Sequence, residues 1–355
     1  MFKILAINPG STSTKIALYE DDNPIFVESV KHDPEELSQF ADYREQYQFR
    51  TNVIRNILKS KGFDEKSLSA VVGRGGPFKA LASGTYRIND AMKTDVLNGN
   101  VQAEHISNIG CLLASDIAEP LNIPAFIVDP VSVDEFDDLA RISGHPEITR
   151  RSLGHALNLK MVAKKFAKQC GKPYEQMNLV IAHLGGGISI SSHRKGKMVD
   201  INNANDEGPF SPQRCGTLPI TQLAKLCYSG KYSEREMKIQ LIKKGGLFAL
   251  TGTDDVIELK SRFDNGDKHA ELCLRAMAYQ ISKYIGAYAV VLDGDVDAIL
   301  IAGGIAQVDW FVDWIKTMTK WIAPIHVFPG EDEMEALALG ALRILNREEK
   351  TMEYK

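Results

Sequence analysis

Apolar and polar residues form short blocks along the chain, and the spacing within these blocks predicts both strands and helices. Short apolar or alternating runs bounded by turn residues indicate strands. Such runs occupy residues 3–7, 15–19, 70–72, 125–128, 179–182, 188–192 and 298–302. Apolar residues at helical spacing indicate amphipathic helices at residues 52–61, 157–168, 270–291 and 331–347. This mixture predicts an α/β protein whose sheets are covered by helices.

One unit of strand, small-residue loop and strand occurs twice. The first unit spans residues 3–19, and the second spans residues 179–192 in the other half of the chain. Such a repeat suggests an internal duplication, in which each domain opens with a hairpin whose turn approaches a shared ligand. That ligand is then expected in a cleft between two domains.

The chain length favours the same organisation. A chain of 355 residues exceeds the roughly 250 to 300 residues at which a single hydrophobic core stops growing, so two domains are expected. The acidic stretch at residues 131–146 is where we expect the connection between them.

Composition and charge narrow the classes of function. The chain is 44% hydrophobic and 25% charged, and its formal net charge of -4 comes without a basic block. Neither nucleic acid nor a membrane is therefore expected as a partner, and small-molecule chemistry is favoured. No apolar stretch has the length of a signal peptide or a membrane span. The five cysteines are widely spaced without a CxxC pair, so we expect reduced thiols and a cytoplasmic location.

The first hairpin turn, at residues 8–15, has the composition of a phosphate site. Gly10 allows close approach to the backbone, four hydroxyl residues follow it, and Lys15 adds a cation. A phosphate group presents several anionic oxygens at once and needs such partners. The alternative is an ordinary polar hairpin turn, which explains the Pro-Gly pair but not four hydroxyls and a lysine. The turn is not a Walker loop.

The second turn, at residues 183–187, ends in three consecutive glycines. Glycine lacks the Cβ atom that would hold a phosphate away from the backbone. A Rossmann turn is the alternative, but a strand pattern rather than a helix follows, and GxGxxG is absent. A third glycine turn, at residues 303–304, ends a buried run, where a nucleotide base or ribose could lie.

Two arginines stand among residues of little bulk. Arg74 is followed by Gly75 and Gly76, and Arg214 lies in a Pro-Gln-Arg-Cys-Gly segment. A guanidinium in such surroundings can bind a carboxylate or a phosphate through two parallel hydrogen bonds. The alternative for either arginine is a surface or interdomain salt bridge.

Other polar residues have both a functional and a structural interpretation. Asp129 follows a strand, at a common location for functional carboxylates, but it could be a cap or turn residue. His155 lies near a helix start that favours an anion, and like His105 and His183 it could instead be a packed histidine. The acidic residues 331–333 begin the last helix, and one of them could hold magnesium through water.

Together these motifs resemble the acetate and butyrate kinase family, whose members have the fold of actin and sugar-kinase ATPases. The resemblance spans nearly the whole chain. The family's INxGSxSxK pattern is matched by Ile7, Asn8, Gly10, Ser11, Ser13 and Lys15. Its HLGxG, R-C-G and A-G-I motifs are matched by His183, Leu184, Gly185 and Gly187, by Arg214, Cys215 and Gly216, and by Gly303, Gly304 and Ile305.

The resemblance implies a role for each of these residues. The catalytic residues are expected to be Arg74, Asp129, His155 and Arg214. ATP and its phosphates are expected to contact Asn8, Gly10, Ser11, Ser13, Lys15, His183, Gly185, Gly186, Gly187, Gly303 and Gly304. Magnesium is expected near Asn8 and Glu333, with Glu331 as the alternative glutamate. The pocket for the acid is expected at Gly75, Gly76, Gly154 and His105.

Three departures from the acetate kinase pattern bear on the acid. Gly75 and Gly76 follow Arg74 where a valine walls the acetate pocket, Gly154 replaces a phenylalanine before His155, and Gly186 replaces an asparagine. Loss of two large side chains is expected to open room for several methylenes. Each buried CH₂ contributes about 0.8 kcal/mol to binding, so butyrate or a branched acid is favoured over acetate.

The resemblance thus predicts a duplicated actin-like ATPase fold with a nucleotide cleft. Residues 1–132 and 334–355 are expected to form the N-terminal domain, to which the last helix returns, and residues 133–333 the C-terminal nucleotide-binding domain. The expected reaction is reversible, ATP-dependent phosphorylation of butanoate to butanoyl phosphate and ADP, with Mg²⁺. A homodimer or an assembly of dimers is expected by analogy.

Other functions stay open at this point. The acid could be isobutyrate, or the protein could be an acetate or propionate kinase. A sugar kinase would need an aspartate base and would leave the two arginines without a purpose. A non-catalytic actin-like nucleotide-binding protein would keep both hairpins but would not need Arg74, Arg214, His155 and Asp129.

Overall fold

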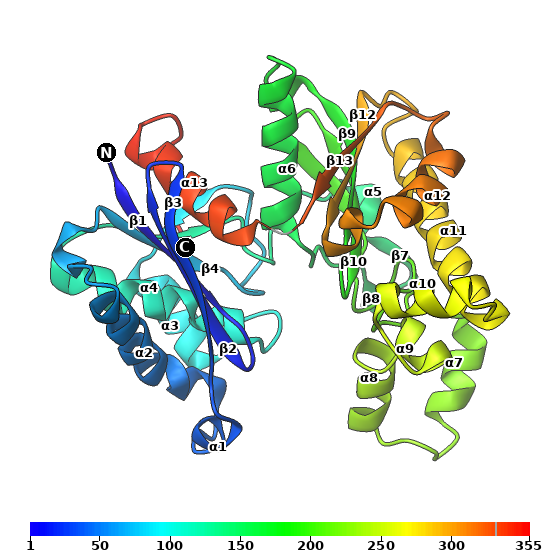
Figure 1. Cartoon of the computed structure of the whole chain (residues 1–355), viewed down its shortest axis with the longest axis horizontal. Helices are drawn as coiled ribbons and strands as arrows, with labels where there is room; N and C mark the ends of the chain where they lie inside the picture. The colour runs from blue at the N-terminus through cyan, green and yellow to red at the C-terminus, as the bar shows by residue number, and fades with distance from the viewer. Residues whose placement is uncertain (331) are drawn as a thin grey trace. The chain divides into compact units, whose positions relative to one another are not determined.

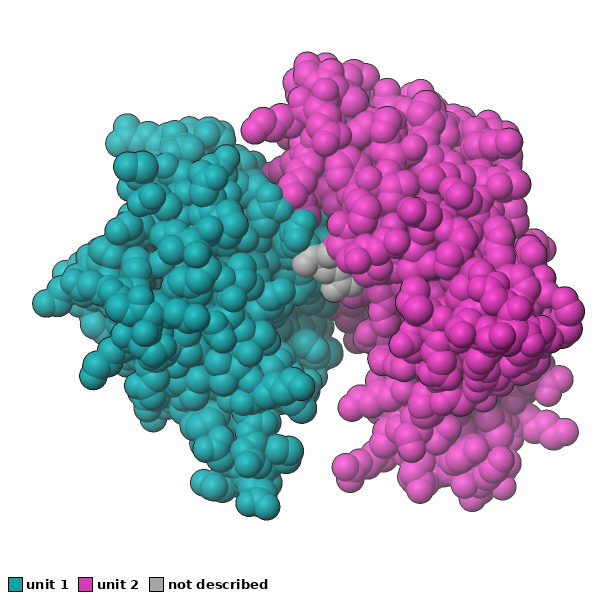
Figure 2. Space-filling view, in the orientation of Figure 1, with its two compact units in different colours: residues 1–134, 156–158, 332–355 teal, residues 135–155, 159–331 magenta. Residues whose placement is uncertain are grey.

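The computed structural model describes residues 1–330 and 332–355 and divides into two compact units (Figure 1, Figure 2). Unit 1 comprises Met1–Asp134, Ala156–Asn158 and Asp332–Lys355, and unit 2 comprises Glu135–His155 and Leu159–Glu331. Each unit has its own main sheet with helices packed on it. The predicted α/β class is therefore confirmed.

The main sheet of unit 1 has six strands in the order β3-β2-β1-β4-β6-β5. Their bounds are Lys3–Pro9 (β1), Ser13–Glu20 (β2), Asn23–Lys31 (β3), Ala70–Arg74 (β4), Thr85–Arg87 (β5) and Ala125–Val128 (β6). An antiparallel meander of β1, β2 and β3 is extended by β4 and β6, which run parallel to β1.

The main sheet of unit 2 repeats this arrangement with five strands in the order β11-β10-β9-β12-β13. Their bounds are Asn178–Leu184 (β9), Ile188–Arg194 (β10), Lys197–Ile201 (β11), Ala298–Gly303 (β12) and Ile325–Pro329 (β13). Again an antiparallel meander is extended by two parallel strands. A separate hairpin joins Ile142–His145 (β7) to Ile148–Thr149 (β8). The duplication predicted from the repeated hairpins is confirmed.

The helices include every amphipathic segment that the sequence predicted. Their bounds are Pro34–Leu37 (α1), Tyr47–Ser60 (α2), Asp90–Asn98 (α3), Gly110–Ala118 (α4), Asp138–Arg141 (α5), Ala156–Gln169 (α6), Ile220–Cys227 (α7), Glu234–Ile242 (α8), Gly246–Thr251 (α9), Val256–Asp264 (α10), Lys268–Val290 (α11), Asp309–Thr319 (α12) and Glu333–Leu345 (α13). Within the part of the chain that the structure describes, none of them has the length and apolarity needed to cross a membrane.

The alternation of side chains along the strands of unit 1 decides which helix each residue meets. α4 packs on one face of the sheet, and α13 packs on β1, β4 and β6 from the other face (Figure 1). Leu5, Ile7 and Val71 join the core on the α4 side. Asn8 and Arg74 have the opposite parity and therefore point toward α13.

Two glycines allow α4 to begin directly against the end of β4. A Cβ atom at Gly73 would lie 2.2 Å from the carbonyl oxygen of Gly110, and one at Gly110 would lie 2.1 Å from that of Arg74. Neither position can accept a side chain without movement of backbone. The backbone that carries Arg74 is thus held by direct contact with the first turn of a helix.

We expect Gly340→Ala in α13 to destabilise the protein, although alanine favours a helix over glycine by about 1 kcal/mol. A Cβ atom at Gly340 would lie 2.5 Å from both γ-carbons of Val128 in β6, and such overpacking costs about 1–3 kcal/mol. Gly286→Ala in α11 is the matched control, because nothing lies within 4 Å of its Cβ position, and it should stabilise. Chemical denaturation measures both changes. A stabilising Gly340→Ala would refute this packing of α13 on β6.

Candidate active site

Asn8, Arg74 and Glu333 converge where the parallel strands β1 and β4 end. Nδ2 of Asn8 donates a hydrogen bond to Oε2 of Glu333 at 2.6 Å, and Nη1 of Arg74 donates to Oε1 of the same carboxylate. Glu333 stands in the first turn of α13, which covers this face of the sheet. The structure thus brings together three residues that the sequence predicted separately.

The oxygen atoms of this group suit a magnesium ion. Mg²⁺ is commonly bound by one or two carboxylates together with waters and phosphate oxygens. Glu333 supplies a carboxylate and Asn8 a carbonyl oxygen, whereas no group of three or more His, Cys, Asp or Glu among the described residues could enclose a metal. These residues therefore fit an ion held mainly by phosphate and water. Glu331, the alternative glutamate, lies outside the described residues.

Arg74 retains a donor for a ligand. Arg74 is only 8% exposed. Its Nε–H is buried and has no hydrogen-bond partner among the described residues. A buried donor without a partner is costly, and such groups are rare except where a ligand or water completes them. Arg74 can therefore hold Glu333 through one nitrogen and meet an anion through another.

The turn between β1 and β2 carries the other predicted phosphate ligands of unit 1. The backbone N–H of Gly10 donates to the carbonyl oxygen of Ser13 at 2.8 Å and closes the turn. Ser11 is exposed, and Ser13 and Lys15 are half-buried. Asn8 and Lys15 are cross-strand partners, so an amide and a cation stand together at the base of the turn.

Asp129 and His105 both make structural contacts. Asp129 follows β6 with φ +36°, in the left-handed region, and its Oδ1 accepts hydrogen bonds from Ser83 Oγ at 2.7 Å and from Gly84 N at 2.8 Å. His105 is exposed, and its Nδ1 caps a short 3₁₀ helix by accepting from Ser107 N at 3.2 Å. These contacts match the structural alternatives for the two residues, and their functional roles stay predictions.

The three glycines of the expected acid pocket do not face open space where their missing side chains would lie. A Cβ atom at Gly76 would lie 2.1 Å from Oδ1 of Asn108, and one at Gly154 would lie 2.5 Å from Cδ1 of Ile201. Gly75 is enclosed in the same way. Neighbouring residues fill the volume that the sequence comparison assigned to a wider pocket, so the widening does not follow from these glycines. That they line the acid site stays a prediction.

In unit 2, His155 and His183 stack against each other. Their ring centroids are 4.1 Å apart with an interplanar angle of 21°. Nδ1 of His155 lies 2.9 Å from Oγ of Ser189, which is the cross-strand partner of His183. The N-terminus of α6 presents His155 and the end of β9 presents His183. Two imidazoles from distant segments thus lie side by side, with His183 buried and His155 half-buried.

Arg214 lies against the glycine turn between β9 and β10. A Cβ atom at Gly187 would lie 2.5 Å from the guanidinium carbon of Arg214, so a side chain there would require the guanidinium to move. Ser211 fixes this arrangement: its Oγ donates to the carbonyl oxygen of Gly186 at 2.6 Å and accepts from Arg214 N at 3.1 Å. The sequence reasoning missed Ser211, although a serine three residues before Arg214 is typical of a hydroxyl-stabilised turn.

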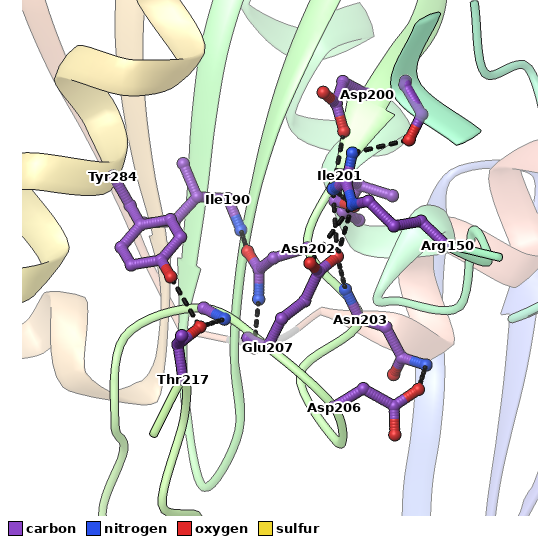
Figure 3. A network of polar contacts seen from close by, with 12 residues as sticks. Arg150, Ile190, Asp200, Ile201, Asn202, Asn203, Asp206, Glu207, Thr217 and Tyr284 are labelled. Atoms are coloured by element: carbon purple, nitrogen blue, oxygen red, sulfur yellow. Dashed lines mark hydrogen bonds and ion pairs between the residues drawn. The ribbon is translucent and has the colours of Figure 1, made fainter. Parts of the chain in front are cut away.

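A polar network holds the segment that carries Arg214 (Figure 3). Arg150 donates to the carboxylates of Asp200 at 3.0 Å and Glu207 at 2.9 Å. Nearer to Arg214 in the chain, the Thr217 hydroxyl lies 2.7 Å from that of Tyr284. Burial alone would lower the pKa of Arg150, but its hydrogen bonds to Glu207 and Asp200 raise that pKa above the usual range. This cation is fully compensated by carboxylates.

Arg214 is a cation without such compensation. Burial lowers the pKa of its guanidinium, and no nearby carboxylate opposes that effect. Within the described residues its guanidinium makes neither an ion pair nor a hydrogen bond. Arg214 is half-buried, and even partial removal of a charge from water is costly unless an opposite charge accompanies it. The site around Arg214 and Gly187 is therefore built for an anion.

A cavity of about 510 Å³ opens beside this turn. Gly185 and Gly186 line it from one side, and Gly304 and Ile305, which follow β12, line it from another. The two predicted glycine turns of unit 2 therefore border one space. Gln213 and Asp254 also line the cavity and are joined by a hydrogen bond of 2.6 Å from Nε2 to Oδ2. No sequence motif indicated the latter pair.

Sequence and fold both match known proteins. Residues 145–314 match the model of the Acetokinase family. The chain is 50% identical over 354 residues to "Probable butyrate kinase" of Clostridium botulinum (strain Alaska E43 / Type E3), covering 99% of both proteins. The acetate kinase structure from Porphyromonas gingivalis superposes with a TM-score of 0.80 at 19% identity, over 97% of this chain and 100% of that one. A propionate kinase structure from Francisella tularensis subsp. tularensis SCHU S4 gives 0.74 at 17% identity, over 96% and 99%.

These matches agree with the geometry of both units. The likeness to solved kinases confirms the predicted actin-like ATPase fold. The relative that is 50% identical over 99% of the chain shows the family as well as the fold. The chain belongs to the acetokinase family.

Proposed function

We propose that this protein transfers the γ-phosphoryl group of ATP to the carboxylate of butyrate, reversibly, and so forms butyryl phosphate and ADP. Membership of the acetokinase family supports the reaction, and the relative named "Probable butyrate kinase" supports the acid. The observation that carries the proposal is the half-buried guanidinium of Arg214, which packs against Gly187 without a carboxylate partner among the described residues. Such a group suits the charge of a phosphoryl group in transfer.

The reaction needs charge stabilisation more than a base. A carboxylate is already an anionic nucleophile, so no proton has to be removed from it. Its oxygen attacks the γ-phosphorus in line while the bond to the ADP oxygen breaks, and the electron pair of that bond stays on ADP. Arg74 and Arg214 stabilise the charge on the equatorial oxygens, and His155 and His183 add hydrogen bonds.

The nucleotide is held by backbone more than by side chains. We assign the adenosine to the cavity bordered by Gly185, Gly186 and Gly304, where bare backbone allows close approach. Asn8 and Glu333 would hold magnesium, which neutralises phosphate charge when bound. Asp129 would help to position the ion.

The assembly and the location of the protein are also proposals. We propose a homodimer or an assembly of dimers, supported by α7, none of whose residues is buried although it carries apolar side chains such as Ile220 and Leu226. We propose a cytoplasmic location, supported by five cysteines that are all free thiols.

A hydroxamate assay for acyl phosphate tests the reaction and the acid together. The protein is incubated with Mg-ATP and acetate, propionate, butyrate, isobutyrate or isovalerate. We expect the highest kcat/KM with butyrate. Absence of acyl phosphate with every acid would contradict the proposed function. Equal kcat/KM for acetate and butyrate would retain the reaction but contradict the acid, and a maximum with isobutyrate would favour a branched-chain kinase.

The packing at Gly154 gives a second prediction. Gly154→Ala would press on Cδ1 of Ile201 and place a methyl group 3.3 Å from Oγ of Ser189, which contacts His155. We expect kcat with butyrate to fall about tenfold, because displacement of Ser189 would weaken its contact with His155, and a loss of about 1.4 kcal/mol of transition-state stabilisation is tenfold in rate.

The double variant Gly154→Ala/Ile201→Val removes Cδ1 and should restore most of kcat, with Ile201→Val alone as the control. If Gly154 instead borders the acyl chain, Gly154→Ala will raise the KM of butyrate more than that of acetate. The double variant will then fail to restore it. Steady-state kinetics on both acids separates these outcomes.

A further inference from the structure

One buried arginine of α2 binds the backbone carbonyls of the β1–β2 turn. Arg50 has no solvent exposure. Its Nη1 donates to Gly10 O at 2.8 Å, Ser13 O at 2.9 Å and Thr14 Oγ1 at 3.0 Å, and its Nη2 reaches Ser11 O at 3.3 Å. On its other side, Nε and Nη2 donate to Oε1 of Gln46 at 3.1 and 2.9 Å. One guanidinium therefore contacts four residues of the turn.

Every acceptor of Arg50 is electrically neutral. The acceptors are three backbone carbonyls, one hydroxyl and one side-chain amide, and no carboxylate pairs with Arg50 in the described ranges. Burial lowers the pKa of Arg50 to about 10. A buried cation is usually compensated by a carboxylate. Lys160 of unit 2, which is 1% exposed, is an example, because Glu135 pairs with it at 2.5 Å. The charge of Arg50 is therefore uncompensated within the turn.

The contacts of Arg50 also orient the peptide groups of the turn. In a trans peptide the N–H of the following residue points away from the preceding carbonyl oxygen. Because the carbonyls of Gly10 and Ser11 point toward Arg50, the N–H groups of Ser11 and Thr12 point to the opposite side. Successive N–H groups on one side of a turn form an anion-binding surface. The guanidinium thus turns the donors of this segment outward.

Burial and the charge of Arg50 both affect the pKa of a neighbouring histidine. Nε2 of His32 lies 2.7 Å from the Thr14 hydroxyl, which also accepts from Arg50. Burial, together with the charge of Arg50, lowers the pKa of His32 to about 4. The histidine is neutral near pH 7 and does not add to the local charge, so Arg50 is the buried cation of this region.

We propose that Arg50 is a positioning residue for the nucleotide: it fixes the β1–β2 turn with its N–H groups outward and supplies positive potential for the phosphates. The proposal rests on the proposed function in that the anion is taken to be that of ATP or ADP. The sequence motif of residues 8–15 does not contain Arg50, which acts through the backbone of the turn rather than on the ligand.

Nucleotide binding tests the proposal without relying on catalysis. The Kd of Mg-ADP is measured by calorimetry for wild type, Arg50→Lys and Gln46→Leu. Lysine keeps the charge but cannot contact both the turn and Gln46. We therefore expect the Kd of Mg-ADP to rise about tenfold or more, as for loss of one charge-assisted hydrogen bond. Gln46→Leu removes a half-buried partner that orients the guanidinium and should give a smaller rise. Arg55→Lys is the matched control on the same helix, since Arg55 is half-exposed and contacts Glu65 and Asp116.

Kinetics separates positioning from a general loss of structure. With butyrate as acid, Arg50→Lys should raise the KM of ATP and leave that of butyrate unchanged. The proposal is overturned if neither Arg50→Lys nor Gln46→Leu changes the Kd of Mg-ADP. It is also overturned if Arg50→Lys raises the KM of ATP and the KM of butyrate equally. If wild type binds Mg-ADP but forms no acyl phosphate, the proposed function fails, while the binding comparison still decides the role of Arg50.

Discussion

Positive charge without a carboxylate partner, set against the backbone of a hairpin turn, is the feature that both units share; the charge is fully buried at Arg50 and half-buried at Arg214. In unit 1 the guanidinium of Arg50 meets the carbonyls of the turn at residues 10–13. In unit 2 that of Arg214 packs on Gly187. Taking such a group out of water is costly unless an anion or several dipoles accompany it. The dipoles of the turn accompany Arg50, whereas no such acceptor among the described residues accompanies the guanidinium of Arg214; each group lies beside a hairpin turn suited to phosphate.

The rest of the architecture positions these two turns. Both lie between the first two strands of an antiparallel meander that two parallel strands extend. The parallel neighbours end at the same edge, so β4 brings Arg74 to the level of Asn8, and β12 ends in glycine beside the turn after β9. Cations with structural tasks follow another rule, since Arg150 and Lys160 each have carboxylate partners. Arg50 and Arg214 lack such a partner, whereas Arg74 shares the carboxylate of Glu333.

The sequence predicted the parts of this arrangement that depend on local pattern. Buried strands, amphipathic helices and glycine turns have fixed periods and compositions, and these were found. The strands β3 and β13 were missed because neither has a buried residue. Arg50 was missed because its partners are backbone carbonyls 37 to 40 positions away, which no side-chain motif records. The sequence could not decide between open space and close packing at Gly154, because glycine permits both, and only the fold places Ile201 against it.

The central claim is that the uncompensated charge of Arg214 serves the phosphoryl group in transfer rather than the nucleotide at rest. Binding of Mg-ADP is therefore compared with binding of Mg-ADP plus aluminium fluoride and butyrate, a mimic of the transferring phosphoryl group. Arg214→Ala should weaken the mimic by at least about tenfold more than it weakens Mg-ADP alone. Equal weakening of both, or tight binding of the mimic by the variant, would contradict the account.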